Sequence, residues 1–514
     1  MEYTTILWLL LALFCCLVLV VMGYVCYAFI YRRYLYRHIP GPPITHFIKG
    51  NAVEMLKMIA NGYPLDEYLL NCHKAYGPVV CIWLFHEPLL SVTTPELVRE
   101  TLAVRNFPKS SKLFQCGVRL FGARLAGHGL ITNFDHENWL VRRETLNPAF
   151  HRRYLKNIMP IFNECCAAFE NKLARYADGR TRVKLLDEIC PLTLDVLSRA
   201  AYGTDFQIVN NPDSPFPTAF NLTMSGMEMF VFNPLHWLDF RTFPFQRKVV
   251  EACKFLRKTG NDMLVQRRRD IEAGKEVPSD LLTFIVKSGE KLSDILTDVD
   301  LIDELVTFFY AGHETTARTL AFTFMELGFH PEVMEKLVSE ITSVLPPTGD
   351  VTMEHLNKLQ YTWLCLRETL RLYPIAAGLR RYINTPCELG GYQIPDKTDL
   401  YVSSYVSARM PGNFEDAKEY RPERWLSEEV VVNSRLTQFP FSVGYRTCIG
   451  QTFAMMETKT LLARILRKYV IDLVPGHSKK ITQRITIQPR DMVECFVSKR
   501  EWPQTTREPN EKSP

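Results

Sequence analysis

One cysteine lies in a glycine-punctuated loop directly before a predicted helix. The loop reads Phe441-Ser-Val-Gly-Tyr-Arg-Thr-Cys-Ile-Gly450, and apolar residues at helical spacing follow from Phe453 to Tyr469. At such a position, backbone N–H groups and the positive end of the helix dipole stabilise an anion and lower the pKa of a thiol. The glycines permit tight turns and the close approach of a flat cofactor. Cys448 is therefore predicted to be a functional thiolate, although most isolated cysteines are buried structural residues.

The pattern F-x-x-G-x-R-x-C-x-G in this loop resembles the haem-binding loop of the cytochrome P450 family. Its five fixed residues would occur together by chance in about one of ten thousand chains of this length. The resemblance implies that Cys448 ligates the iron of haem b, that Phe441 packs beside the ligand and that Arg446 pairs with a haem propionate. Electron donation by the thiolate favours cleavage of the O–O bond, as in a haem-thiolate monooxygenase.

A second unusual segment, Ala311-Gly-His-Glu-Thr-Thr316, interrupts an apolar helix predicted over 301–320. Helical spacing places Ala311, Gly312 and Thr315 on one face. On its own, the segment would indicate a kinked core helix in which a threonine bonds back to its own carbonyl groups.

The same segment resembles the oxygen-activation motif of the family, and its position upstream of the cysteine loop agrees. The resemblance implies that Ala311 and Gly312 border the haem, where the missing side chain of Gly312 leaves room for dioxygen. Thr315 would hydrogen-bond the distal oxygen, and Glu314 would help to relay protons. Such a relay favours a monooxygenase over a haem-thiolate isomerase or dehydratase, which rearranges lipid hydroperoxides without external electrons.

Four further arginines, a glutamate and a tryptophan fit the family pattern. Glu368 and Arg371 share one helical face, which alone would indicate a weak, solvated surface pair. By resemblance, they form a buried triad with Arg424 that braces the cysteine loop. Arg143 and Arg381 would be propionate partners by resemblance to the family's W-x-x-x-R motif and post-helix arginine, with Trp139 alongside; each arginine alone could be an ordinary surface charge.

Electrons must come from another protein, because the chain carries no flavin, nicotinamide or iron–sulfur fingerprint. The resemblance implies NADPH-cytochrome P450 reductase as the donor, with cytochrome b5 as an additional partner. Basic residues near the expected proximal side of the haem are predicted to form a docking surface for an acidic partner, although each alone is more often a solvated helix charge. They are Arg142, Arg152, Arg153, Lys156, Arg464, Arg467 and Lys468.

The N-terminus is predicted to be a single-pass transmembrane anchor. Residues 6–30 carry no charge and are long enough to cross a bilayer as a helix. Positive charge follows the apolar run rather than preceding it, which disfavours a cleaved signal peptide and places the body on the cytoplasmic side. We expect anchoring in the endoplasmic reticulum membrane by residues 1–31, followed by a basic, proline-rich hinge over 32–43.

The rest of the 514-residue chain is predicted to be one folded unit. No internal repeat or low-complexity linker divides residues 44–500, which form the expected haem-thiolate catalytic domain, and residues 501–514 form a polar tail that we expect to be disordered. A net charge of +5 disfavours nucleic-acid binding. The 14 cysteines lack paired spacings, which indicates a reducing compartment.

Periodicity predicts a mainly α fold with a small β region, as in the cytochrome P450 fold. The predicted helices span 154–176, 247–274, 296–329, 331–344, 354–372 and 451–469. The predicted strands are Val79 to Leu84, Leu89 to Thr93, the pair around Gly391, and Ile481 to Ile487.

Segments expected to face a substrate are rich in Phe, Leu, Met and Ile, which suits a large apolar ligand. They lie at 109–130, 215–245, 304–315 and 375–380. Within the family, the resemblance favours hydroxylation of a sterol side chain. The alternatives are a hydroxylase of fatty acids or other lipids and xenobiotics, the hydroperoxide isomerase or dehydratase, and a membrane-tethered lipid-binding protein without redox activity.

Overall fold

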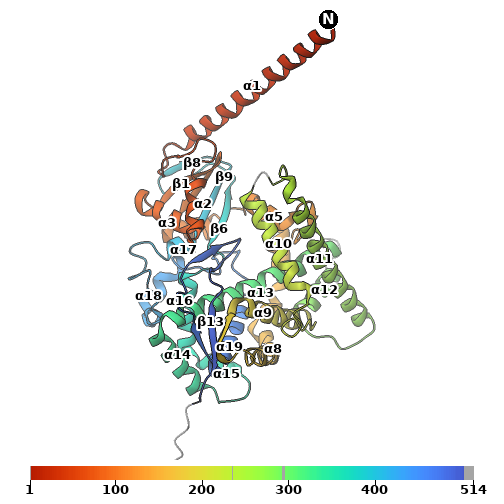
Figure 1. The fold of residues 1–514 in the computed structure, drawn as a ribbon, viewed down its shortest axis with the longest axis vertical. Coiled ribbons are helices and arrows are strands. Elements are labelled where there is room, and N and C mark those ends of the chain that lie inside the picture. Colours follow the sequence, from red (N-terminus) through yellow and green to blue (C-terminus); the bar gives the residue numbers. More distant parts are fainter. Residues whose placement is uncertain (1, 234–235, 292–295, 503–514) are drawn as a thin grey trace, which may run out of the picture.

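The computed structural model describes residues 2–233, 236–291 and 296–502. Its first helix, α1 (Glu2–Tyr36), projects away from the remaining elements (Figure 1). This helix is long and apolar enough to cross a membrane, with a mean hydropathy of 3.0 in its most apolar window, none of which is buried. Residues 503–514, most of the expected tail, lie outside the described residues.

The expected hinge over 32–43 begins later than predicted, because α1 stays helical to Tyr36. The segment after it is irregular and packs on the body: Cys81 donates its N–H to the carbonyl oxygen of Pro40 at 2.8 Å. A Cβ on Gly41 would lie 2.0 Å from the Cys81 carbonyl oxygen, so this close approach requires glycine. The proline-rich segment is therefore attached to the body along one side.

The body is mainly helical, as predicted. Its longer helices are α2 (Ala52–Ala60), α3 (Leu65–Tyr76), α5 (Ser111–Val118), α6 (His136–Leu146), α8 (Met159–Leu173), α9 (Leu185–Tyr202), α10 (Pro215–Phe232), α11 (Phe243–Glu272), α12 (Leu281–Lys291), α13 (Asp298–Phe329), α14 (Pro331–Val344), α16 (Gln360–Leu372) and α19 (Gln451–Lys468). Shorter helices are α4 (Pro95–Arg99), α7 (Arg152–Leu155), α15 (Met353–Lys358), α17 (Ser404–Ser407) and α18 (Glu428–Asn433).

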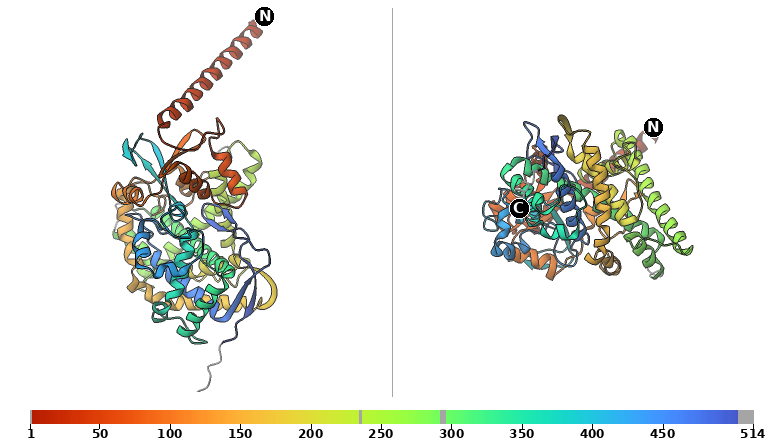
Figure 2. Two further views of the ribbon diagram at one scale, coloured as in Figure 1. Left: turned by 90° about the vertical axis from the view of Figure 1, so that its left-hand side faces the viewer. Right: turned by 90° about the horizontal axis from the view of Figure 1, so that it is seen from below.

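The strands form small sheets. A four-stranded sheet near the base of α1 has the order β1-β2-β9-β6, in which only β2 and β9 are parallel (Figure 1). A three-stranded sheet, β10-β13-β5, lies in the half of the body remote from α1 (Figure 2). The strands are β1 (Val79–Leu84), β2 (Glu87–Val92), β3 (Arg119–Leu120), β4 (Ala123–Arg124), β5 (Asp178–Lys184), β6 (Gly378–Ile383), β7 (Cys387–Leu389), β8 (Tyr392–Ile394), β9 (Thr398–Ser403), β10 (Tyr469–Leu473), β11 (Ile481–Gln483), β12 (Ile487–Pro489) and β13 (Glu494–Lys499).

Several element boundaries differ from the predictions. The helix expected over 154–176 is shorter, at Met159–Leu173, and the one expected over 354–372 is broken between α15 and α16. Residues 481–487 form most of a hairpin rather than one strand. Two long helices, α9 and α10, were not predicted: α9 contains Pro191, and proline in a sequence usually ends or kinks a helix.

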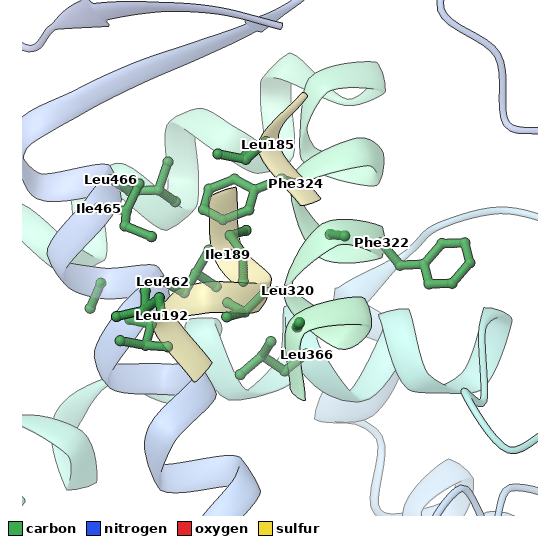
Figure 3. Close-up of a cluster of buried hydrophobic side chains, with 14 of the residues drawn as sticks. Leu185, Ile189, Leu192, Leu320, Phe322, Phe324, Leu366, Leu462, Ile465 and Leu466 are labelled. Atoms are coloured by element: carbon green, nitrogen blue, oxygen red, sulfur yellow. The ribbon is translucent and has the colours of Figure 1, made fainter. Parts of the chain in front are cut away.

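The core joins the two segments that carry the predicted chemistry. Side chains from α9, α13, α16 and α19 meet in one apolar cluster (Figure 3), and each of the following is at most 1% exposed: Leu185, Ile189, Leu192, Leu320, Phe322, Phe324, Leu366, Leu462, Ile465 and Leu466. Such interiors are close-packed and resist small displacements. The segment at 311–316 on α13 and the loop before α19 are therefore held in one rigid block.

Candidate functional site

The cysteine loop has the tight backbone that its glycines predict. Cys448 donates its N–H to the Phe441 carbonyl oxygen at 2.8 Å, and Gly444 has a φ of +77°. A Cβ on Gly444 would lie 2.3 Å from the Leu102 carbonyl oxygen, so only glycine fits. The helix α19 starts directly after Gly450. Phe441 packs against the core cluster that includes α19 residues, and its place beside the ligand stays a prediction.

The electrostatics of the Cys448 thiol differ from the prediction. Burial raises its pKa, and the N–H groups of Gly450 and Gln451 together with the charge of Arg143 lower it by less. The predicted donors are thus in place, but the predicted net lowering is wrong for the free thiol because desolvation outweighs them. Coordination to a metal ion removes a thiol proton outright, so this balance is compatible with an iron ligand.

The solvent exposure of Cys448 also agrees with a role as the iron ligand. Its side chain is exposed, although the surrounding protein is close enough to desolvate the thiol. A flat prosthetic group bound through this sulfur would lie between the loop and the neighbouring elements.

Four cations gather near this loop: Lys109, Arg143, Arg381 and Arg446. Burial lowers the pKa of Arg381 to about 10, and burial with the charges of Arg381 and Arg143 lowers that of Arg446 to about 10. Burial and the charges of Arg446 and Arg381 hold the pKa of Lys109 well below its usual value. Within the described ranges, none of the four has a carboxylate at ion-pair distance, and their hydrogen bonds go to carbonyl oxygens and one amide.

Arg381 is 2% exposed, and the other three are partly exposed. Because a buried charge without a counter-charge is costly, this cluster indicates an anionic partner that is not part of the chain. Guanidinium and ammonium groups are the usual partners of carboxylates. The two propionates of haem b fit this cluster, and the residues present therefore fit the predicted cofactor. Arg143, Arg381 and Arg446 were predicted from motifs; Lys109 was missed because no motif marks it, and it reaches Arg381 only through a β-bridge between distant segments.

We predict that replacing Lys109 by Met weakens haem retention, because one cation of the propionate cluster is lost. Loss of a supporting residue of this kind typically costs about tenfold or more in affinity. The measurement is the rate of haem transfer to excess apomyoglobin. Lys254→Met is the matched control, since Lys254 pairs with Glu251 at 2.9 Å on the surface. Equal rates for the two variants would contradict a propionate role for Lys109.

The helix α6 presents Trp139 and Arg143 one turn apart, on the side facing the cysteine loop. Arg143 donates Nη1–H to the Thr447 carbonyl oxygen at 2.7 Å. Trp139 is 2% exposed, and the guanidinium of Arg446 lies 4.0 Å from its ring centroid. A cation at this distance from an indole face is stabilised by the ring quadrupole. Trp139 therefore lies alongside the propionate cluster, as predicted.

The segment at 311–316 lies within the continuous helix α13. Thr315 donates its hydroxyl to the Ala311 carbonyl oxygen at 2.8 Å, and its oxygen keeps lone pairs that can accept a hydrogen bond. A Cβ on Gly312 would lie 2.8 Å from a terminal methyl group of Leu197 on α9, so this glycine allows the two helices to pack closely. The roles expected for Thr315, Glu314, Ala311 and Gly312 toward dioxygen and the haem stay predictions.

The predicted triad is present and fully buried. Glu368 receives two hydrogen bonds from Arg371, at 2.8 and 2.9 Å, and one from Arg424 at 2.9 Å. Trp425 donates its indole N–H to the same carboxylate at 3.0 Å. This network joins α16 to the segment Pro422–Leu426, which precedes the cysteine loop. Its contacts agree with the bracing role that the resemblance implies.

The predicted basic docking surface is wrong for three of its residues. Arg142 is buried and pairs with Glu304 at 3.0 Å, and Arg464 is buried and pairs with Glu170 at 2.7 Å. Arg467 is buried as well and donates to the backbone carbonyl groups of residues 346 and 349. Lys468 also pairs with Glu170. Arg152 and Lys156 are exposed, as a docking surface requires. The side chain of Arg153 lies outside the part of the chain that the structure describes.

Two acidic residues of α13, which no sequence motif marks, hold a neighbouring loop against this helix. Asp303 accepts hydrogen bonds from Arg124 at 3.0 Å, Arg257 at 2.7 Å and the N–H of His128 at 2.9 Å. Its neighbour Glu304 accepts from the N–H of residue 130 at 3.0 Å. Burial raises the pKa of Glu304 to about 7. These bonds hold the loop at 124–130 against α13, the helix that carries the segment at 311–316.

Comparison with known proteins agrees with this geometry. The cytochrome P450 family profile matches residues 40–494, which include both the cysteine loop and the distal segment. Cytochrome P450 4d2 of Drosophila melanogaster is 28% identical over 478 residues, covering 89% of this chain and 93% of that protein. Cytochrome P450 3A9 of Rattus norvegicus is 27% identical over 445 residues, covering 84% and 85%. The chain therefore belongs to the cytochrome P450 family of haem-dependent monooxygenases.

Proposed function

We propose that this enzyme hydroxylates the side chain of a sterol at the endoplasmic reticulum membrane. As a P450 it uses haem b, with electrons from a reductase, and incorporates one atom of dioxygen into its substrate. The proposal adds the substrate, NADPH-cytochrome P450 reductase and cytochrome b5 as partners, and a catalytic domain on the cytoplasmic face.

The observation that carries the substrate proposal is one buried apolar cluster around the first half of α13. Three of the four segments expected to face a substrate contribute to it, and the fourth, at 375–380, contributes Ile375 to the main core instead. The charges beside this cluster are compensated within the protein, because Arg142 pairs with Glu304 and Arg124 pairs with Asp303. A large, mostly apolar molecule suits such a lining. Cluster members include Leu120, Leu125, Leu130, Phe216, Phe220, Met224, Met227, Leu305 and Phe308.

Sequence resemblance points in the same direction. Several stretches resemble cholesterol 24-hydroxylase, including Val265-Gln-Arg-Arg-Arg269, Phe322-Thr-Phe-Met-Glu-Leu327 and Cys448-Ile-Gly-Gln451. They support a sterol over a fatty acid, whose acyl chain would also fit an apolar lining.

The chain's own residues have separable tasks in this reaction. Bound through Cys448, the haem supplies the reductive activation of dioxygen. The cysteine thiolate donates electron density, and the four cations of the propionate cluster orient the cofactor. Thr315 positions a proton by hydrogen bonding, Glu314 moves protons toward it, and the apolar distal cluster excludes water.

The anchor supports access to a lipid substrate. Its C-terminal end is attached to the body, since Arg32 pairs with Glu87 at 2.8 Å and the Tyr36 hydroxyl lies 2.5 Å from the Thr398 hydroxyl. The first sheet therefore lies close to the proposed membrane surface. Positive charge after the apolar run, which includes Arg32, favours a cytoplasmic body.

The test is turnover of cholesterol by the purified enzyme with reductase and NADPH in lipid vesicles. We expect a side-chain-hydroxylated product, identified by mass spectrometry, and none when NADPH is omitted. Hydroxylation of fatty acids alone would refute the sterol proposal. Conversion of a lipid hydroperoxide without reductase would favour the isomerase or dehydratase.

A further inference from the structure

A groove that is open to solvent lies between α10 and α11, two helices that run side by side (Figure 1). Residues of both helices and of the turn before α10 line it. Its volume is about 700 Å³, which lies within the range of about 300–1,000 Å³ that is usual for small-molecule sites. The groove is therefore large enough to hold a ligand.

The floor of this groove is apolar. Ala219 and Ala252 are buried there, and Leu222 and Phe255 are half-buried. Because alanine side chains are short, they leave space between the two helices that longer side chains would fill. The floor thus offers apolar surface to a ligand, as small-molecule sites commonly do.

The rim of the groove carries positive charge. Arg247 and Lys248 of α11 line the groove and are exposed, and neither has a carboxylate at ion-pair distance among the residues that the structure describes. Of the two acids in the lining, Glu251 is paired with Lys254 at 2.9 Å, which leaves Asp213. Two unpaired cations thus accompany one unpaired acid, and this balance favours an anionic ligand.

Aromatic side chains separate the groove from α13. The ring of Phe216 has its centroid 5.1 Å from that of Phe255, which lines the groove, and 6.4 Å from that of Phe309 on α13. Phe220 lies 6.0 Å from Phe309 in the same way. The rings of Phe216, Phe220 and Phe309 belong to residues that are at most 7% exposed. The groove is therefore separate from the helix that carries the segment at 311–316.

We propose that this groove is a second binding site, which holds a fatty acid. Its carboxylate binds to Arg247 and Lys248, because a guanidinium group can donate two parallel hydrogen bonds to a carboxylate. Its acyl chain lies on the apolar floor, where contact with Leu222 and Phe255 removes apolar surface from water. The site does not depend on the sterol proposal, since it lies on the outer side of the aromatic layer.

The experiment measures binding rather than turnover. A photoactivatable diazirine fatty acid is added to the full-length holoenzyme in vesicles of neutral phospholipid, with a haem-binding azole at saturating concentration to occupy the distal site. Mass spectrometry of the peptides then locates the label. We expect saturable labelling within 212–222 and 247–255. The methyl ester of the same probe, which carries no charge, should require an about tenfold higher concentration for half-maximal labelling.

Two variants change the charge of the groove. Arg247→Gln combined with Lys248→Gln removes both cations, and Thr218→Glu adds an acid at an exposed position of the lining. Each should raise the probe concentration for half-maximal labelling about tenfold. The matched control combines Lys258→Gln with Lys275→Gln, which removes two exposed cations that do not line the groove, and should label as wild type does.

Equal half-maximal concentrations for the two double variants would refute the groove site. Label confined to other peptides, or lost when the azole is present, would overturn it as well, because the fatty acid would then bind elsewhere or only in the distal site. Retention of the red-shifted carbon-monoxide band in each variant shows that the fold is intact. Failure of the sterol proposal would appear in the turnover assay and would leave this labelling unchanged.

Discussion

Replacing Cys448 by Ser is expected to abolish NADPH-driven hydroxylation, with a loss of more than about a thousandfold, or about 4 kcal/mol in activation free energy. The serine oxygen occupies the same place in the loop but does not donate electron density as a thiolate does. The reduced, carbon-monoxide-bound enzyme should lose the strongly red-shifted haem band that a thiolate ligand causes. Absorption spectra of the purified protein, recorded before and after addition of carbon monoxide, check this directly.

A suitable control is Cys387→Ser, which changes a partly exposed thiol on β7. It should retain the red-shifted band and the activity. If Cys448→Ser kept the band, the iron ligand would have to be another residue, and the assignment of the loop would be wrong.

Replacing Glu368 by Gln is expected to destabilise the fold by about 3–5 kcal/mol, because Arg371 and Arg424 would then be buried without a counter-charge. All three side chains are at most 2% exposed. Since the triad joins α16 to the segment before the cysteine loop, we also expect faster loss of haem. Chemical denaturation followed by circular dichroism measures the first effect, and haem transfer to apomyoglobin measures the second.

The matched control is Glu415→Gln, in which an 80% exposed carboxylate loses its pair with Arg421. Surface pairs of this kind contribute about 0–1 kcal/mol, so little change is expected. A Glu368→Gln variant as stable as Glu415→Gln would show that the triad does not brace the fold.

The parts of the site that were predictable share one property: they lie in short, closely spaced motifs. The residue types and spacing around Cys448 indicated a tight loop before a helix, and the structure has that loop. Arg143, Arg381 and Arg446 came from motifs of the same kind, and the structure brings them together without carboxylate partners among its described residues. The oxygen-activation roles of Thr315 and Glu314 still rest on the resemblance.

What could not be predicted depends on contacts between distant segments. Arg142 and Arg464 lie on helices whose charge pattern suggests a solvent face, but each is paired with an acid from another helix, Glu304 or Glu170. No local pattern carries that pairing. Lys109 reaches the propionate cluster through a bridge to a strand more than two hundred residues away. The pKa of the Cys448 thiol depends on how much protein surrounds it, and the spacing of residues along the sequence does not indicate that burial.

We propose that this chain incorporates an oxygen atom from dioxygen into a lipid substrate at a haem ligated by Cys448. The most direct measurement is turnover under oxygen-18 gas with reductase and NADPH, followed by mass spectrometry of the product. We predict one labelled oxygen atom per hydroxylated product and a strict requirement for NADPH. An unlabelled product, or one formed equally well without NADPH and reductase, would contradict oxygen insertion from dioxygen.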